Sequence, residues 1–179
     1  MSEYKIASRY AKALFDKAKE LKVLDTIKAD MEHLKKMTEE SRDFRIFLNS
    51  PLYKKAVKQN SLDTLFSSSH ELTKGIYKLM VDKFRETYIP AMGRAFIQMY
   101  NKDNNIVDVY VESALELDKK VLSEIEAFVK KETEAKSVVL HTSVDKEIMG
   151  GVTIEFEGKI FDNTVLTQLK NIKKELQIA

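Results

Sequence analysis

The sequence predicts a mainly α-helical fold, in which a six-helix bundle over residues 1–105 is followed by a small α/β unit over residues 106–179. Three observations support this division. Apolar residues recur at helical spacing as far as Tyr100. The polar run of residues 101–105 interrupts that pattern. From Ile106 onward, apolar residues alternate with polar ones, as in a strand with one buried face. We therefore expect two domains with this boundary.

Composition is that of a globular protein without a metal or thiol site. Of the 179 residues, 44% are hydrophobic, which is enough to bury a core. The absence of cysteine excludes disulfides and thiolate ligands, and the three histidines are too scattered to suggest a metal cluster. No apolar run is long enough to span a bilayer. The N-terminus enters an amphipathic helix at once, so we expect no targeting segment, no direct membrane insertion and a cytosolic chain.

Charge is divided unevenly between the two predicted domains. The net charge is +2, made up of +6 over residues 1–105 and −4 over residues 106–179. The lysines are interleaved with acidic residues and do not form a basic patch, which argues against nucleic-acid binding. The opposite signs suggest different partners for the two domains.

The first helix, Tyr4 to Leu21, has more apolar surface than one packing interface requires. One stripe is suited to a core: Ala7, Ala11, Leu14, Phe15, Ala18 and Leu21. Beside it lies a second strip: Ile6, Tyr10 and Ala13, continued by Lys17. Further helices of the same domain could bury this strip. Alternatively, it is one wall of a docking groove for a partner helix, in which Ala13 allows close approach and Tyr10 is a rigid anchor.

The next three segments carry helical patterns with clear breaks between them. Asp25 or Thr26 is expected to cap the second helix, and Pro51 to occupy the first turn of the fourth. A short apolar turn lies between these two helices. The expected buried residues of the three segments are Ile27, Met31, Leu34, Met37, Phe44, Phe47, Leu48, Val57, Leu62, Leu65 and Phe66.

The fifth helix, Glu71 to Arg85, is the candidate for a second groove wall. Its expected buried side contains Leu72, Ile76, Leu79, Met80 and Phe84. Gly75 is costly inside a helix, by about 1 kcal/mol relative to alanine. It is either incidental or it permits another helix to pack closely. In the second case the groove residues on this helix are Gly75, Lys78, Leu79 and Asp82. A sixth helix follows, with Pro90 in its first turn.

The second domain is expected to have the order β-α-β-β-α. Residues 106–112 form a strand with Val107, Val109 and Val111 on the buried face, and residues 116–134 a long helix. Residues 137–142 form a second strand. The segment 151–161 reads as a hairpin that turns at Glu157-Gly158. A last helix, capped near Asp162 or Asn163, carries an apolar series: Val165, Leu166, Leu169, Ile172 and Leu176.

Catalytic motifs are not evident. There is no P-loop, and Gly150-Gly151 lacks the context of a phosphate-binding loop, so a close backbone approach before the hairpin is the better explanation. The serines at residues 67–69 have no base nearby and indicate a loop. One enzymatic alternative pairs His141 with Asp145 or Asp162 in a cleft. No cofactor or metal is expected.

Three segments carry a resemblance to a known family: YKIASRYAKALFDKAKE near the N-terminus, FLNSPL, and VDKEIMGGVTIEFEGKIFDNTVLTQLKNIKKEL near the C-terminus. Together they resemble the delta subunit of bacterial F-type ATP synthase, known in mitochondria as the oligomycin-sensitivity-conferral protein. The family commonly has Asp-Gly-Ser where this chain has Asp162-Asn163-Thr164. That departure is mild, because Asn tolerates unusual backbone angles and Thr can cap a helix.

The resemblance implies a non-catalytic stator subunit, present in one copy per complex and peripheral on the cytoplasmic face of the bacterial plasma membrane. It links the F1 head to the b-subunit peripheral stalk, so that rotor torque drives ATP synthesis. It implies that the N-terminal segment of an alpha subunit binds between the first and fifth helices, at Ile6, Tyr10, Ala13, Lys17, Gly75, Lys78, Leu79 and Asp82. It places the b-subunit dimer near Gly150, Gly151, Asp162 and Thr164. The alternative is an unrelated helical adaptor that binds another amphipathic helix.

Overall fold

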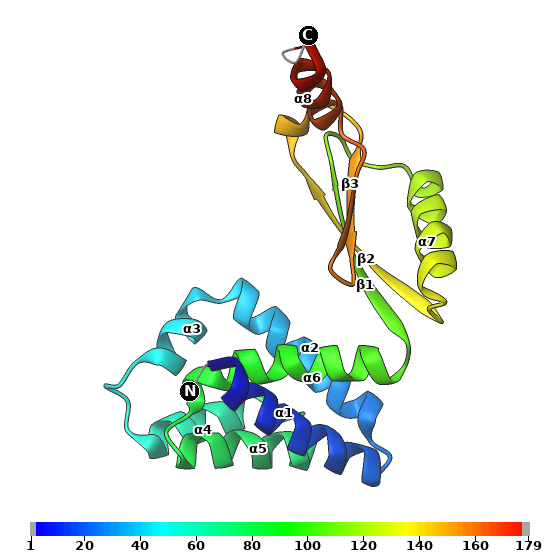
Figure 1. Ribbon diagram of the computed structural model, residues 1–179. Coiled ribbons are helices and arrows are strands. Elements are labelled where there is room, and N and C mark those ends of the chain that lie inside the picture. The colour runs from blue at the N-terminus through cyan, green and yellow to red at the C-terminus, as the bar shows by residue number, and fades with distance from the viewer. Residues whose placement is uncertain (1–2, 177–179) are drawn as a thin grey trace. The chain divides into compact units, whose positions relative to one another are not determined.

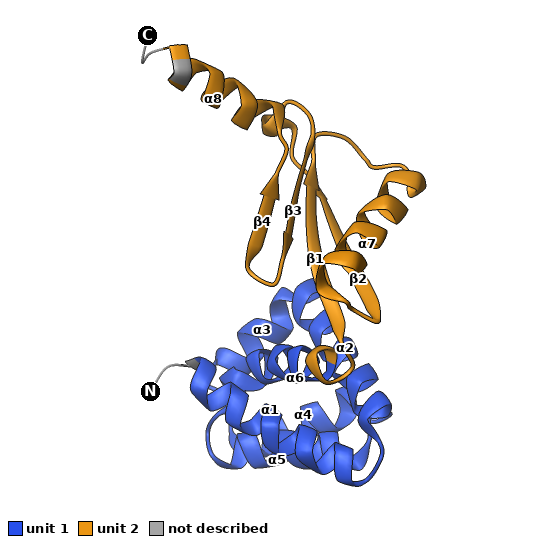
Figure 2. Cartoon of the chain, turned by 45° about the vertical axis from the view of Figure 1, so that its right-hand side comes forward, with its two compact units in different colours: residues 1–100 blue, residues 101–179 orange. Residues whose placement is uncertain are grey.

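The structure is a computed structural model that describes residues 3–176. It divides into two compact units, unit 1 over residues 1–100 and unit 2 over residues 101–179 (Figure 2). The division falls a few residues before the boundary expected from the sequence. Asn101 belongs to unit 2, where its side-chain amide donates to Asp108 over 2.6 Å.

Unit 1 is helical throughout (Figure 1). Its helices are α1 (Glu3–Glu20), α2 (Leu24–Glu40), α3 (Arg42–Asn49), α4 (Lys55–Leu65), α5 (Glu71–Asp82), the short 3-10 helix η1 (Glu86–Tyr88) and α6 (Ile89–Asp103). All of the α-helices contribute to one core. Its largest fully buried side chains include Tyr77, Phe66, Phe96, Ile27 and Met31. Pro90 lies in the first turn of α6, as the sequence predicted.

The core stripe of α1 is confirmed over most of its length. Ala7, Ala11, Leu14 and Ala18 are buried against the rest of unit 1. Leu21, which was expected to continue this stripe, is 48% exposed. The reason is that α1 ends at Glu20 and the chain turns away through Lys22, which has a positive φ of 58°. The stripe therefore stops one residue earlier than its periodicity suggests.

Three expectations for α2 to α4 are wrong. Neither Asp25 nor Thr26 caps α2, because Val23 holds the N-cap position and the Asp25 carboxylate instead accepts the Tyr100 hydroxyl at 2.6 Å. Pro51 does not begin a helix. It lies in a turn after α3, and α4 begins at Lys55.

The buried face of α4 also differs from the expected one. Val57 and Leu65 are exposed, whereas Leu62 and Phe66 are buried as expected. Lys58 takes the place of Val57 in the interior and is only 3% exposed. A charged residue at this position was not foreseen, because burial of lysine requires a specific partner that periodicity does not reveal.

The buried side of α5 was predicted in part: Met80 is buried as expected, and Leu72 and Ile76 are partly buried against the core. Its buried side is formed by Thr73, Tyr77, Met80 and Val81. Tyr77 packs edge-on against Phe66, with ring centroids 5.1 Å apart, and this contact fixes the rotation of the helix. Leu79 and Phe84, both expected in the core, are 43% and 78% exposed.

Unit 2 contains a mixed sheet with a helix along one face (Figure 2). Its elements are β1 (Ile106–Ser113), α7 (Lys119–Thr133), β2 (Ser137–Val144), the 3-10 helix η2 (Lys146–Ile148), β3 (Val152–Phe156), β4 (Lys159–Asp162) and α8 (Val165–Leu176). The strand order is β2-β1-β3-β4, with β1 parallel to β2 and antiparallel to β3. Over the described residues the chain is therefore mainly helical, with one small four-stranded sheet in its C-terminal unit.

The predicted alternation in β1 is confirmed. Val107, Val109 and Val111 are buried and form a core with Ile125 and Val129 of α7. The β3–β4 hairpin turns at Glu157 and Gly158, whose φ values of 49° and 75° are those of a tight turn. Within residues 3–176, no helix combines the length and the apolar character that crossing a bilayer would require.

Candidate functional site

The first candidate site is a surface formed by α1 and α5, which pack side by side (Figure 1). We call it the α1–α5 surface, and it consists of Ile6, Tyr10, Ala13, Lys17, Gly75, Lys78, Leu79 and Asp82. Ile6, Tyr10 and Asp82 are partly buried, and the other five residues are exposed. Within the described part of unit 1, the second strip of α1 is therefore covered only in part: Tyr10 packs against the core, whereas Ala13 and Lys17 are exposed.

Gly75 leaves open room on this surface. A Cβ atom built at Gly75 meets no heavy atom within 4 Å, so the glycine is not required by packing inside unit 1. One turn later, Leu79 exposes an apolar side chain beside this opening. Gly75 lowers the stability of the helix but leaves room for a further helix to approach closely. Leu79 offers that helix an exposed apolar side chain to pack against.

Charged side chains lie toward the C-terminal ends of α1 and α5 on this surface. Asp82 accepts hydrogen bonds from Lys55 Nζ at 2.6 Å and from Gln59 Nε2 at 2.7 Å. The hydrogen bond from Lys55 holds the pKa of the Asp82 carboxyl below its usual range. On α1, Lys17 pairs with Glu20 at 2.9 Å. The surface thus combines apolar residues with fixed charges that can set the register of a bound helix.

A polar network positions the start of α5. His70 holds the N-cap, where its Nδ1 atom accepts from the Leu72 backbone N–H at 3.1 Å. From α2, Asp30 accepts the His70 backbone N–H at 2.9 Å and the Thr73 hydroxyl at 2.6 Å. His70 directly follows the serines at residues 67–69, which the sequence indicated as a loop. The structure shows that it holds one wall of the candidate site in place.

Replacing His70 by alanine is expected to lower the stability of unit 1 by about 1 kcal/mol, because the first turn of α5 loses its side-chain cap. Thermal unfolding followed by circular dichroism measures this effect. His70→Ser is the matched control, since a serine hydroxyl can accept the same backbone N–H and should retain most of the stability. Equal loss in both variants would contradict the capping role.

The second candidate site lies where the β3–β4 hairpin meets α8. Gly151 has a φ of +83°, and a Cβ atom there would approach the Asn163 carbonyl oxygen to 2.2 Å. Gly150 accepts the Val165 backbone N–H at 3.0 Å. The predicted close backbone approach is therefore present, and it joins the two glycines to the segment that begins α8.

Asp162 and Thr164 fix the first turn of α8. The cap was expected near Asp162 or Asn163, and it is formed by the adjacent Thr164, whose hydroxyl accepts from the Thr167 backbone N–H at 3.2 Å. Asp162 supports this cap by accepting the Thr167 hydroxyl at 2.7 Å and the Thr164 backbone N–H at 2.9 Å. The hydrogen bond from the Thr167 hydroxyl lowers the pKa of Asp162. These residues hold α8 at a defined angle to the hairpin.

The apolar series of α8 is exposed. Val165, Leu169, Ile172 and Leu176 are all at least 42% accessible to solvent. Their spacing of four, three and four residues gives one continuous apolar stripe. In Figure 2, α8 extends beyond the end of the sheet. The sequence pattern showed an apolar series for this helix without indicating what covers it, and within the described part of unit 2 the apolar face is not covered by the unit itself.

The enzymatic alternative is wrong. His141 pairs with Asp108 at 2.9 Å and stacks on Tyr110 at 4.9 Å. Asp162 ends β4, at the opposite edge of the sheet from β2, about 14 Å away at normal strand spacing. Asp145 follows β2 four residues after His141, about 13 Å along the chain direction. The three side chains do not converge in a cleft.

The fold and the two surfaces together define a class of protein. The chain is a two-unit binding protein whose candidate sites are exposed helical surfaces. Residues 6–176 match the family described as the ATP synthase delta (OSCP) subunit. The chain belongs to this family, and it is therefore a structural subunit of ATP synthase.

Individual relatives agree with this assignment. The chain is 32% identical to ATP synthase subunit delta of Carboxydothermus hydrogenoformans over 176 residues, which cover 98% of this chain and 99% of the relative. It is 34% identical to ATP synthase subunit delta of Clostridioides difficile over 173 residues, which cover 96% and 95% of the two chains.

One solved structure has a similar fold. It is a chain in a cryo-EM structure of the Toxoplasma gondii mitochondrial ATP synthase hexamer, and it is 20% identical to this protein, with a TM-score of 0.79. The match covers 96% of this chain and 97% of that chain. The two proteins thus share the arrangement of their elements over nearly their whole length.

Proposed function

We propose that this subunit is the joint of the ATP synthase stator, which ties the F1 head to the peripheral stalk. The observation that carries the proposal is the presence of two uncovered helical surfaces, one on each unit, in a chain that belongs to the delta family. A joint needs two attachments and no active site. In this proposal the first domain, a six-helix bundle over residues 1–105, supplies one attachment, and the second domain, over residues 106–179, supplies the other.

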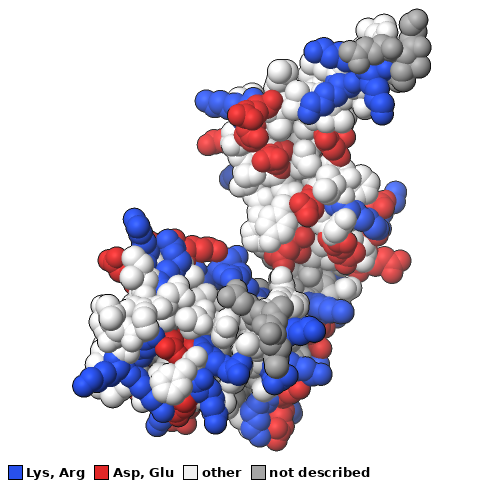
Figure 3. Space-filling model, turned by 60° about the vertical axis from the view of Figure 1, so that its left-hand side comes forward, with Lys and Arg blue, Asp and Glu red and all other residues white. Residues whose placement is uncertain are grey.

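The α1–α5 surface is proposed to bind the N-terminal helical segment of an alpha subunit. Tyr10, Ala13, Gly75 and Leu79 form its apolar part, where the segment's apolar side would lie. Lys17, Lys78 and Asp82 flank this part with charge, and Figure 3 shows basic side chains spread over the visible face of unit 1. An amphipathic segment with acidic and apolar residues would be complementary to this surface.

Unit 2 is proposed to hold the b-subunit dimer of the peripheral stalk. The apolar stripe of α8 suits packing against a long helix, because residues spaced by three and four positions form a seam. Gly150, Gly151, Asp162 and Thr164 act mainly by fixing the start of α8. Their role in the contact is therefore to present the helix.

The proposed mechanism is mechanical. Proton flow turns the rotor inside the alpha/beta hexamer, and the hexamer would turn with it unless it were held. Two linked attachments raise the effective concentration of each bound end, so the whole joint dissociates slowly even if each contact is moderate. We place one copy per complex, peripheral on the cytoplasmic face of the bacterial plasma membrane.

Titration calorimetry of the full chain tests both attachments. One arm uses a synthetic peptide of the cognate alpha subunit's N-terminal segment, and the other uses the soluble part of the b-subunit dimer. Saturable binding is expected in both arms. Prior binding of either ligand should leave the affinity for the other unchanged. A folded chain that binds neither ligand would contradict both proposed attachments.

An aspartate in place of Ile172 is expected to weaken binding of the b-subunit dimer at least tenfold, because it would bury a charge in the seam. Ile172 is exposed in the free chain, so the stability of unit 2 should change little. The measurement is the same titration, with Lys173→Asp as a control for the added negative charge on α8. Equal weakening by both variants would point to net charge and not to the apolar stripe.

A further inference from the structure

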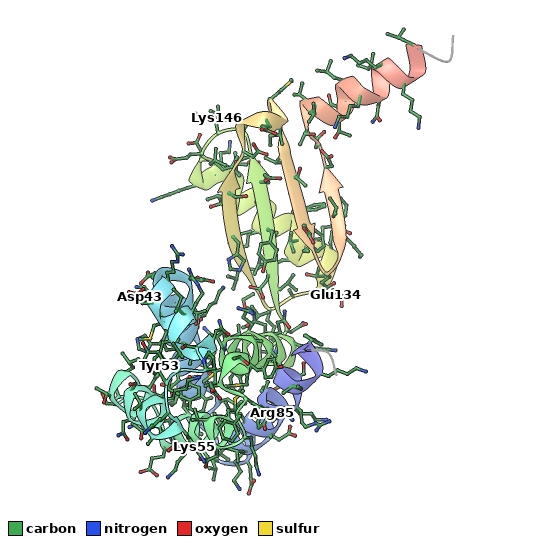
Figure 4. All side chains as sticks on the ribbon, turned by 90° about the vertical axis from the view of Figure 1, so that its left-hand side faces the viewer. Asp43, Tyr53, Lys55, Arg85, Glu134 and Lys146 are labelled. Atoms are coloured by element: carbon green, nitrogen blue, oxygen red, sulfur yellow. The ribbon has the colours of Figure 1, made fainter. Side chains whose placement is uncertain are left out.

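Unit 1 contains a pocket that plays no part in either proposed attachment. It has a volume of about 300 Å³ and lies among the loop after α3, the start of α4, the end of α5 and η1. Tyr53 and Lys55, both labelled in Figure 4, are among its lining residues. The volume is at the lower end of the range for small-ligand sites. Three unusual features of the chain meet here.

The first feature is a buried ion pair in the pocket wall. Lys58 is 3% exposed, and its Nζ atom donates to the Leu48 carbonyl at 3.1 Å and to Glu86 Oε1 at 2.6 Å. Burying two charges is favourable only where their remaining polar atoms are also satisfied.

The second feature is an orphaned acceptor. Glu86 Oε2 is buried, and nothing within the described part of the chain donates to it. A buried acceptor of this kind costs about 1–3 kcal/mol until it is given a hydrogen bond. A donor that reached this oxygen from the pocket would remove that cost.

The third feature is an exposed aromatic side chain on a strained backbone. Phe84 has a φ of +56°, and it follows α5 at the position where glycine is usual. The backbone there closes the helix through hydrogen bonds from Phe84 N to the Val81 carbonyl and from Arg85 N to the Met80 carbonyl. Phe84 nevertheless points its ring outward and is 78% exposed, at the rim of the pocket. Tyr53 provides a second aromatic ring on the same rim.

We propose that this pocket binds a neutral planar aromatic group that carries an N–H or O–H donor. The aromatic ring would lie against Phe84 and Tyr53, and the donor would satisfy Glu86 Oε2. A cation is disfavoured because Lys58 and Lys55 both line the pocket. A fully ionised anion has no proton to donate to the carboxylate. Indoles and phenols have the required chemistry.

Such a group has two natural sources, a free small molecule or the side chain of a tryptophan or tyrosine on a protein partner. The inference does not depend on the stator role, because the lining residues are not those of the α1–α5 surface or of α8. The failure of either proposal would leave the other in place.

The test is an NMR titration of the full chain with indole, phenol and toluene as probes. Indole and phenol are expected to give saturable shifts at Phe84, Tyr53 and Glu86, with at least tenfold weaker binding of toluene because it has no donor. N-acetyltryptophanamide distinguishes the sources. If N-acetyltryptophanamide binds as tightly as indole, the natural ligand is a side chain of a protein partner. If N-acetyltryptophanamide does not bind but indole does, the natural ligand is a free molecule. Equal binding of toluene, or binding of no probe, overturns the proposal.

Variants make the test specific. Phe84→Gly should weaken indole binding at least tenfold while the chain stays folded, since glycine is favoured at this backbone angle. Leu52→Ala is the control, because Leu52 is exposed beside Tyr53 in the loop after α3 but does not line the pocket. Glu86→Gln should remove the preference for indole over toluene, since the amide supplies its own donor. Unchanged indole affinity in Phe84→Gly would contradict the site.

Discussion

Aspartate in place of Ala13 or Leu79 is expected to abolish binding of the alpha-subunit segment, with a loss of affinity of at least a hundredfold. Each substitution would place an unpaired charge in the apolar part of the α1–α5 surface, and burying it there costs several kcal/mol. Both positions are exposed in the free chain, so the free energy of unfolding should change by no more than about 0.5 kcal/mol. Titration calorimetry measures the affinity, and circular dichroism follows the fold.

Matched controls separate the surface from general effects of added charge. Ala29→Asp makes the same chemical change as Ala13→Asp, at an exposed position on α2. Leu65→Asp matches Leu79→Asp, because Leu65 on α4 is 44% exposed and Leu79 is 43% exposed. Both controls should bind the segment as the original chain does. If the controls lose binding equally, or if folded Ala13→Asp still binds, the α1–α5 surface is not the attachment point.

Helical and strand periods could be predicted from the sequence because they arise from local geometry. The α1 stripe from Ala7 to Ala18 and the alternation of Val107, Val109 and Val111 each record which face of one element is buried. The hairpin turn at Glu157-Gly158 is likewise a local property of the backbone. Such features need no knowledge of what packs against them.

Tertiary partners could not be predicted in the same way. Asp25 looked like a helix cap, but it bonds Tyr100 from a helix far along the chain. The His70 backbone N–H donates to Asp30, which is 40 residues away in the chain. Lys58 looked like a surface residue, although Glu86 and the Leu48 carbonyl hold it in the interior. Periodicity carries no information about such distant hydrogen bonds.

The candidate sites show why a second apolar strip is ambiguous in a sequence. Ile6, Tyr10 and Ala13 had two explanations, internal packing or a partner, and the structure leaves Ala13 uncovered within unit 1. For α8 the pattern showed an apolar series without indicating what covers it, and the structure shows an exposed face. An apolar stripe indicates that another element packs against it, but only the fold shows whether that element belongs to the same chain.

Alanine in place of Gly151 is expected to detach α8 from the hairpin and to lower the stability of unit 2 by about 3 kcal/mol, a cost typical of strain at a special backbone angle combined with a clash. The new Cβ atom would lie 2.2 Å from the Asn163 carbonyl oxygen, and the residue keeps a φ of +83°. Relief requires the chain to move at residues 163–165. That movement would break the hydrogen bond from Val165 N to the Gly150 carbonyl.

Gly158→Ala is the control that separates strain from the clash. Its φ of +75° is similar, but a Cβ atom there meets nothing within 4 Å, so only the backbone cost of about 1 kcal/mol remains. Hydrogen exchange of the α8 amides and titration with the b-subunit dimer should both show the difference. In Gly151→Ala, α8 loses protection and the dimer no longer binds, while the alpha-subunit segment binds unit 1 as before. If the dimer still bound a variant with an unprotected α8, the stalk contact would have to lie on the sheet or α7, and the stripe of α8 would need another partner.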